Sequence, residues 1–242
     1  MEILLIILFS SLFIILFSNR SFVQILKDYA KKEYDEYINH EFVNRIADGT
    51  LPVESFKYYL RQDYIYLTHY ARVHAICGFK LDNLRKIADE ANIINIIRTE
   101  TQLHIKYCES WGISLEELER TKEASANMAY TRFCIEKGLA GDILDLKVAL
   151  FACLIGYGEI ANRIVNDPKT KKENNPFYKW AENYAADLYQ KSITTGIAEL
   201  EELAKEYIKP GDTKRINEIC ETFRQATRLE VGFFDMGLKQ LE

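Results

Sequence analysis

The 242-residue chain has few of the residues that interrupt helices. It contains only 4 prolines and 11 glycines, and runs in which apolar and polar residues alternate, as they do in strands, are nearly absent. Its composition, 48% hydrophobic and 28% charged, is that of a globular protein with a substantial core. These features predict an all-α fold, a single-domain bundle of about seven main helices.

The chain also lacks a CxxC motif and any block of basic residues. Its five cysteines are scattered and odd in number, which argues against a disulfide framework and a zinc site and favours a reducing, cytoplasmic compartment. The net charge is −5 and both signs are interspersed along the chain, so we expect no nucleic-acid partner.

A long hydrophobic run lies at the N-terminus. Residues 3–17 carry no charge, but at about 1.5 Å per residue they fall short of the roughly 30 Å hydrocarbon core of a bilayer. The run has the length of a signal-peptide core, yet Glu2 stands where a basic residue is usual, and no small-x-small cleavage site follows. It could be a signal or short anchor, an extension that is not part of the native folded protein, or an extra packing helix.

We therefore divide the chain into an apolar leader, residues 1–20, and one helical domain, residues 21–242. A membrane partner, and a secretory or membrane-anchored location, are expected only if the leader is a native part of the protein. Capping and turn signals place the expected helices at about residues 21–46, 52–77, 82–111, 114–137, 142–166 and 176–208, followed by a last helix from the 209–213 turn to the C-terminus. A kink near Gly196 could divide the sixth of these helices.

Reactive side chains stand at the centre of otherwise apolar helix faces. Asp63 interrupts such a face in the second expected helix, Cys153 and Tyr157 in the fifth, Tyr184 in the sixth and Glu230 in the last. Taken singly, a buried cysteine or tyrosine is usually an ordinary core residue. Two carboxylates that are costly to bury, with a thiol and phenols on faces that converge in a bundle, instead indicate a site for nucleophilic and acid–base chemistry.

The segments that carry these residues form a recognisable set. They are His40-Glu-Phe-Val43, Asp48-Gly-Thr-Leu-Pro52, Phe56-x-x-Tyr59-Leu-x-Gln-Asp-Tyr-x-Tyr-Leu67, Cys153-Leu-Ile-Gly-Tyr-Gly-Glu159, Tyr178-x-Trp-Ala-x-x-Tyr184 and Ala226-Thr-x-Leu-Glu-x-x-Phe-Phe-Asp235. In this order and spacing they resemble the TenA/thiaminase II family from about residue 21 to the end of the chain, while the leader is not part of the family pattern.

The resemblance implies a heme-oxygenase-like α-helical fold, usually assembled as a homotetramer. It implies a hydrolase of thiamin salvage that cleaves the methylene substituent of a 4-amino-2-methylpyrimidine and releases hydroxymethylpyrimidine. Thiamin and the aminomethylpyrimidine left by thiamin degradation are both open as substrates. The resemblance implies no metal and no organic cofactor.

The same resemblance implies roles for individual residues. Cys153 would be the nucleophile that adds to the pyrimidine ring, Glu230 the acid and base that shuttles protons, and Asp63 the group that holds the polar edge of the ring. The tyrosines implied to bind or flank the ring are Tyr66, Tyr157, Tyr184, Tyr130 and Tyr70. Members of the family often have proline just before the cysteine, and Ala152 here leaves the nucleophile in place but changes the expected bend of the helix.

Two other classes of protein remain open. A metal- or heme-dependent oxidase on the same fold could use Glu100 and His104, one helical turn apart, as half of a carboxylate-bridged site, although such a pair is more often an ordinary surface pair. The other histidines are His40, His69 and His74. A non-catalytic ligand-binding protein would instead pair Asp63 and Glu230 with arginine or tyrosine in the core, and its candidate arginines are Arg61, Arg72 and Arg132.

Overall fold

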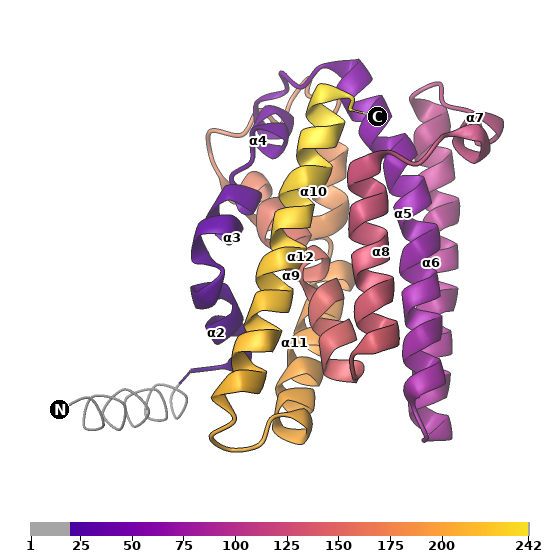
Figure 1. The fold of residues 1–242 in the computed structure, drawn as a ribbon. Helices are drawn as coiled ribbons and strands as arrows, with labels where there is room; N and C mark the ends of the chain where they lie inside the picture. The colour runs from indigo at the N-terminus through magenta and orange to yellow at the C-terminus, as the bar shows by residue number, and fades with distance from the viewer. Residues whose placement is uncertain (1–19, 242) are drawn as a thin grey trace.

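The computed structural model describes residues 20–241, and all of the regular elements in this part of the chain are helices (Figure 1). In chain order they are α2 (Phe22–Tyr29), α3 (Lys31–Ile38), α4 (Glu41–Asp48), α5 (Val53–Lys80), α6 (Leu84–Ser110), α7 (Leu115–Arg120), α8 (Ser125–Ala140), α9 (Ile143–Asn166), α10 (Tyr178–Ala185), α11 (Asp187–Tyr207) and α12 (Thr213–Lys239). The prediction of an all-α fold is confirmed.

The expected number of about seven main helices is too low, because three of the expected helices are divided. The first of them consists of α2, α3 and α4, and α4 has its own start, where the ring of His40 accepts a hydrogen bond from the Phe42 amide. The sixth is divided at Ala186, whose backbone is extended, and not near Gly196. Gly196 lies inside α11, where a side chain would collide with Leu154 of α9, so this glycine serves close helix packing and not a kink.

The fourth expected helix is divided into α7 and α8 by a contact that is distant in sequence. The Gln62 side chain on α5 donates to the Lys122 carbonyl at 2.9 Å and accepts from the Ala124 amide at 3.0 Å. These bonds satisfy backbone groups that would otherwise be buried without partners, so the extended connection between α7 and α8 is stable.

Helix α9 lies among the other long helices. It contacts α3, α5, α8, α10, α11 and α12, and most of its residues are buried. An apolar sequence on nearly all sides is what such a position requires. The helix begins with a capping box in which Asp142 and Asp145 each accept from the other's backbone amide, which fixes the start of the helix that carries Cys153.

Helices α5 and α6 lie side by side and run antiparallel (Figure 1). Two cross-contacts set their register, since Asp63 lies beside His104 and His74 lies beside Glu90. Among the described residues, no helix combines the length and hydrophobicity needed to cross a bilayer. The apolar run at residues 3–17 lies outside the described residues.

Candidate active site

The side chains predicted to form a site converge in the middle of the bundle. They are Asp63, Tyr66 and Tyr70 on α5, Tyr130 on α8, Cys153 and Tyr157 on α9, Tyr184 on α10 and Glu230 on α12. The rings of Tyr66 and Tyr130 are 5.4 Å apart and those of Tyr157 and Tyr184 are 5.0 Å apart, as measured between centroids. The structure therefore brings all eight together from five helices.

Glu230 is the most deeply buried acid of this group, with 1% of its surface exposed. The Tyr130 hydroxyl donates to its Oε1 at 2.7 Å, and no arginine or lysine pairs with it among residues 20–241. Burial raises the pKa of Glu230 to about 8, although interactions with the hydroxyls of Tyr130 and Tyr37 and with the Cys153 thiol partly offset this effect. A carboxyl with such a pKa holds a proton at neutral pH and can still release it.

The Cys153 thiol lies beside Glu230. Protein surrounds Cys153 closely enough that burial raises the pKa of the thiol well above its usual value, and the negative charge of Glu230 raises it further. An interaction with the Tyr66 hydroxyl acts in the opposite direction. Cys153 nevertheless remains partly exposed, unlike the other four cysteines, which are buried. Cys153 is therefore a partly exposed thiol that lies beside a carboxyl able to exchange a proton.

Asp63 has one neighbouring base. His104 Nδ1 lies 3.4 Å from Asp63 Oδ2, while His104 Nε2 donates to the Leu60 carbonyl at 2.9 Å. Burial raises the pKa of Asp63, and the charge of His104 partly offsets that effect. Because Nε2 carries the hydrogen donated to Leu60, Nδ1 of a neutral ring accepts a hydrogen bond from a protonated Asp63, whereas a doubly protonated ring donates to its carboxylate. Either contact orients Asp63.

Three aromatic residues that the sequence analysis did not single out complete the centre. Trp180 Nε1 donates to Tyr59 Oη at 3.3 Å, and Tyr59 Oη donates to Tyr157 Oη at 3.2 Å. The third is Tyr37 on α3. Its buried hydroxyl, like that of Tyr66, makes no hydrogen bond of ordinary length among the described residues, although the two hydroxyls lie close enough to Glu230 and Cys153, respectively, to lower the pKa of those groups. The one feature of the sequence that relates to Tyr37 is the glycine at position 156 of α9. A Cβ there would lie 2.0 Å from Tyr37 Cε1, so only glycine leaves room for the ring.

The Glu100–His104 pair was considered as half of a carboxylate-bridged metal site. Both ring nitrogens of His104 face protein groups, as described above. Within residues 20–241, no group of three or more histidine, cysteine, aspartate or glutamate side chains is placed to hold one.

The arginines considered as core partners for the two acids lie elsewhere. Arg61 pairs with Glu117, and Arg132 pairs with Glu123. Arg72 lies 3.2 Å from a ring nitrogen of His69. None of the three arginines neutralises Asp63 or Glu230, so the arginine pairing expected of a non-catalytic protein is wrong. The tyrosine pairing considered with it does occur, between Tyr130 and Glu230.

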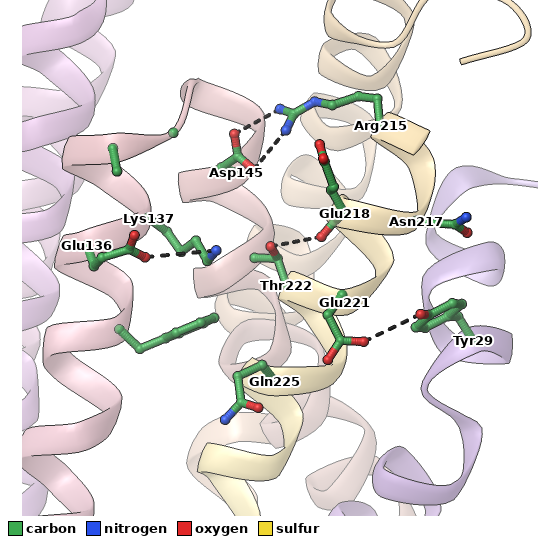
Figure 2. A pocket seen from close by; sticks show the side chains of 13 residues that line it. Tyr29, Glu136, Lys137, Asp145, Arg215, Asn217, Glu218, Glu221, Thr222 and Gln225 are labelled. Atoms are coloured by element: carbon green, nitrogen blue, oxygen red, sulfur yellow. Dashed lines mark hydrogen bonds and ion pairs between the residues drawn. The ribbon is translucent and has the colours of Figure 1, made fainter. Parts of the chain in front are cut away.

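A groove of about 710 Å³ lies on the surface between α8, α9 and α12, with Tyr29 of α2 at its edge (Figure 2). Its arginine is fully engaged, because Arg215 donates to Asp142 at 2.6 Å and to Asp145 at 2.8 and 3.0 Å. None of the eight predicted site residues lines this groove. The groove and the converging centre are therefore different places.

A sequence profile described as the TENA/THI-4/PQQC family matches residues 28–240. The chain belongs to the TENA/THI-4/PQQC family. The match covers every described helix from α3 to α12 and all eight converging residues.

Three curated relatives illustrate what the chain is similar to. It is 36% identical over 216 residues to an uncharacterised protein of Haemophilus influenzae, covering 89% of this chain and 98% of the relative. It is 32% identical over 223 residues to an aminopyrimidine aminohydrolase of Halalkalibacterium halodurans, covering 91% and 96%. It is 36% identical over 202 residues to a protein of Schizosaccharomyces pombe named as a putative hydroxymethylpyrimidine/phosphomethylpyrimidine kinase, covering 84% of this chain and 36% of that one.

Solved structures show the same architecture. A crystal structure from a Silicibacter species, described as a TenA family transcription regulator, superposes with a TM-score of 0.83 at 36% identity and covers 90% of this chain and 96% of that one. A domain from Shewanella denitrificans, described as having a heme oxygenase-like fold, superposes with a TM-score of 0.70 at 14% identity and covers 90% and 92%. The fold is heme-oxygenase-like.

Proposed function

We propose that this protein hydrolyses the bond between the methylene group of a 4-amino-2-methylpyrimidine and its substituent, with thiamin or the aminomethylpyrimidine as substrate. Water replaces the substituent, so that aminomethylpyrimidine gives hydroxymethylpyrimidine and ammonia, and thiamin gives hydroxymethylpyrimidine and the free thiazole. The observation that carries the proposal is the placement of an accessible thiol, Cys153, beside a buried carboxyl, Glu230, with a pKa of about 8.

In the proposed reaction Cys153 adds to the ring carbon next to the one that bears the methylene. The carboxyl of Glu230 donates a proton to the ring nitrogen and receives the proton that the thiol loses. Electrons of the resulting dihydropyrimidine, pushed from its 4-amino group, then expel the substituent, which leaves an exocyclic methylene. Water adds to that carbon, and the reverse proton transfers release Cys153, so the enzyme is unchanged at the end of the cycle.

The remaining residues of the centre hold the ring in this account. Asp63, oriented by His104, accepts hydrogen bonds from the amino edge of the pyrimidine. The buried hydroxyls of Tyr37 and Tyr66 supply further donors beside Glu230 and Cys153. The resemblance implies that Tyr157 and Tyr184 hydrogen-bond around Cys153 and the ring, and that Tyr70 and Tyr130 stack on or flank the ring.

The relatives support the same reaction. The Halalkalibacterium protein is named for aminopyrimidine hydrolysis, and the match covers nearly all of both chains. The Schizosaccharomyces protein is named for phosphorylating hydroxymethylpyrimidine, which is the product proposed here, and a TenA-like segment occupies 36% of it. A hydrolase that makes hydroxymethylpyrimidine is chemically suited to share a chain with a kinase that consumes it.

Release of ammonia from 4-amino-5-aminomethyl-2-methylpyrimidine, and of the thiazole from thiamin, tests the proposal. We expect the wild-type protein and a Cys220→Ala variant to turn over at least one substrate, because Cys220 is buried on α12 and is not one of the converging residues. We expect Cys153→Ala to lose turnover by a factor of about 10³ or more. Absence of turnover in the folded wild-type protein, or full activity in Cys153→Ala, would contradict it.

The proposal carries further expectations from the sequence. We propose that residues 21–242 form one catalytic domain that acts as a homotetramer without a metal or organic cofactor, in a reducing, cytoplasmic environment. Light scattering of a protein lacking residues 1–20 would check the domain boundary and the assembly together.

A further inference from the structure

The proposed active site has an exposed side. Asp63 and Glu230 are 7% and 1% exposed, whereas Cys153, Tyr70 and Tyr184 each keep part of their surface accessible. Tyr189, whose ring is 5.0 Å from that of Tyr184 between centroids, is also partly accessible. These partly exposed residues mark the direction from which a ligand reaches the thiol.

Glu100 lies on this exposed side. It is on the same face of α6 as His104, one turn earlier, and His104 points at Asp63. Because α5 and α6 are antiparallel and are joined by the Asp63–His104 and His74–Glu90 contacts, Glu100 falls beside about residues 66–67 of α5, one turn before Tyr70.

The electrostatic contacts of Glu100 agree with that position. Burial is the main cause that raises the pKa of the Tyr70, Tyr184 and Tyr189 hydroxyls, which come from three different helices, and the negative charge of Glu100 adds a smaller contribution to each. Burial by the surrounding protein raises the pKa of Glu100 itself. No lysine, arginine or histidine pairs with its carboxylate in the described part of the chain, so its charge acts on these three tyrosines without a counter-ion.

We infer that Glu100, with the rings of Tyr70, Tyr184 and Tyr189, forms an outer subsite that binds the positively charged substituent of the substrate. The inference rests on the proposed function, since it concerns the group attached to the pyrimidine methylene. That group is an ammonium in aminomethylpyrimidine and a thiazolium in thiamin. A carboxylate among aromatic faces attracts both kinds of organic cation.

The subsite also distinguishes substrate from product. Hydrolysis replaces the cationic substituent with a neutral hydroxyl, so hydroxymethylpyrimidine keeps the ring contacts but loses the attraction to Glu100. The protein therefore binds substrate more tightly than product, and Glu100 contributes to KM for charged substrates more than to kcat.

The test compares two ligands that share the ring and differ in charge. In Glu100→Gln we expect KM for aminomethylpyrimidine to rise roughly tenfold, while the inhibition constant of hydroxymethylpyrimidine stays the same within about twofold. Added salt should raise KM for aminomethylpyrimidine in the wild type and have a smaller effect in the variant. Glu109→Gln, on an exposed part of the same helix, makes the same change in net charge and should leave both constants unchanged.

An unchanged KM in Glu100→Gln, or equal weakening of both ligands, would overturn the role of Glu100. The same shift in Glu109→Gln would overturn it too, because the effect would then come from net charge alone. A wild-type protein that turns over neither aminomethylpyrimidine nor thiamin is a different result, and it would overturn the proposed function instead.

Discussion

Two buried glutamates in this bundle differ in what lies beside them. Glu90 on α6, 4% exposed, is 2.7 Å from His74 Nδ1 and 2.6 Å from Lys147 Nζ. Glu230 on α12, 1% exposed, has the Tyr130 hydroxyl as its hydrogen-bond donor. Burial acts to raise the pKa of both. For Glu90 the hydrogen bond from His74 and the charge of Lys147 outweigh it and hold the pKa at about 2, whereas the pKa of Glu230 is about 8.

The difference shows two ways in which a helical bundle accommodates a buried acid. One places a lysine and a histidine from neighbouring helices beside the carboxylate, which joins α5, α6 and α9 but leaves the carboxylate ionised at any physiological pH. The other keeps the carboxyl neutral, which weakens the fold at neutral pH but retains a proton that can move. The first arrangement suits a structural role and the second suits catalysis.

The largest expected effect separates the two glutamates by activity. Glu230→Gln keeps the shape of the side chain and removes its ability to exchange a proton, so we expect kcat for pyrimidine hydrolysis to fall about 10²- to 10⁴-fold. Glu90→Gln should retain kcat within a few-fold under conditions where the variant is folded. Steady-state assays of both variants, with circular dichroism to verify folding, provide the measurement. An equal fall in kcat in the two variants would contradict the assignment of a catalytic role to Glu230 and a structural role to Glu90.

The pH dependence of stability should have opposite signs for the two residues. The pKa of Glu230 is raised from 4.5, so its contribution to stability is fully present below about pH 4.5 and is lost as the pH rises through about 8. The pKa of Glu90 is lowered from 4.5, so its contribution is present above about pH 4.5 and is lost as the pH falls toward 2.

Urea unfolding over this pH range, in wild type and in the two glutamine variants, measures these contributions. We expect the difference in unfolding free energy between wild type and each variant to change by roughly 3–5 kcal/mol across its own window. As the pH rises, the unfolding free energy of Glu230→Gln increases relative to that of the wild type. Parallel pH profiles for the two variants would contradict the assignment.

A smaller effect is expected from Tyr130→Phe. The Tyr130 hydroxyl donates to Glu230 and so lowers the carboxyl pKa, and its removal should raise that pKa above about 8. If the reaction needs protonated Glu230, the alkaline fall in kcat/KM should move to higher pH by up to about one unit. A shift to lower pH would show that Tyr130 does not stabilise the carboxylate. Tyr64→Phe is a matched control, because Tyr64 lies on α5 outside the converging set.

The sequence was sufficient to predict the long helices and the convergence of Asp63, Cys153, Tyr157, Tyr184 and Glu230, because each stands at the centre of an apolar face. Tyr66, Tyr70 and Tyr130 were expected beside them only from the family resemblance. It could not predict that His104 orients Asp63, since that contact depends on the register between α5 and α6. Tyr37 was missed for a similar reason, because it lies on α3, a short helix whose approach to α9 depends on Gly156. The roles of Cys153 and Glu230 came from a family resemblance and stay predictions.

The ion pair of Lys147 with Glu90 was also missed. Lys147 lies in a helix of almost continuous apolar sequence, and nothing local identifies its partner. Helix breaks were predicted poorly where a distant side chain decides them, as Gln62 does between α7 and α8. Local signals predict where helices occur, while tertiary contacts decide how they are divided and which charges they bury.

The most direct test is a pH titration of the glutamate carboxyl carbons by NMR, in protein labelled with ¹³C at glutamate. Signals are assigned by their loss in Glu230→Gln and in Glu90→Gln. We predict that the Glu230 signal titrates near pH 8 and that the Glu90 signal shows no titration above about pH 4. A Glu230 carboxyl that titrates below about pH 5 would be an ordinary ionised acid at neutral pH and would contradict its role as the proton carrier.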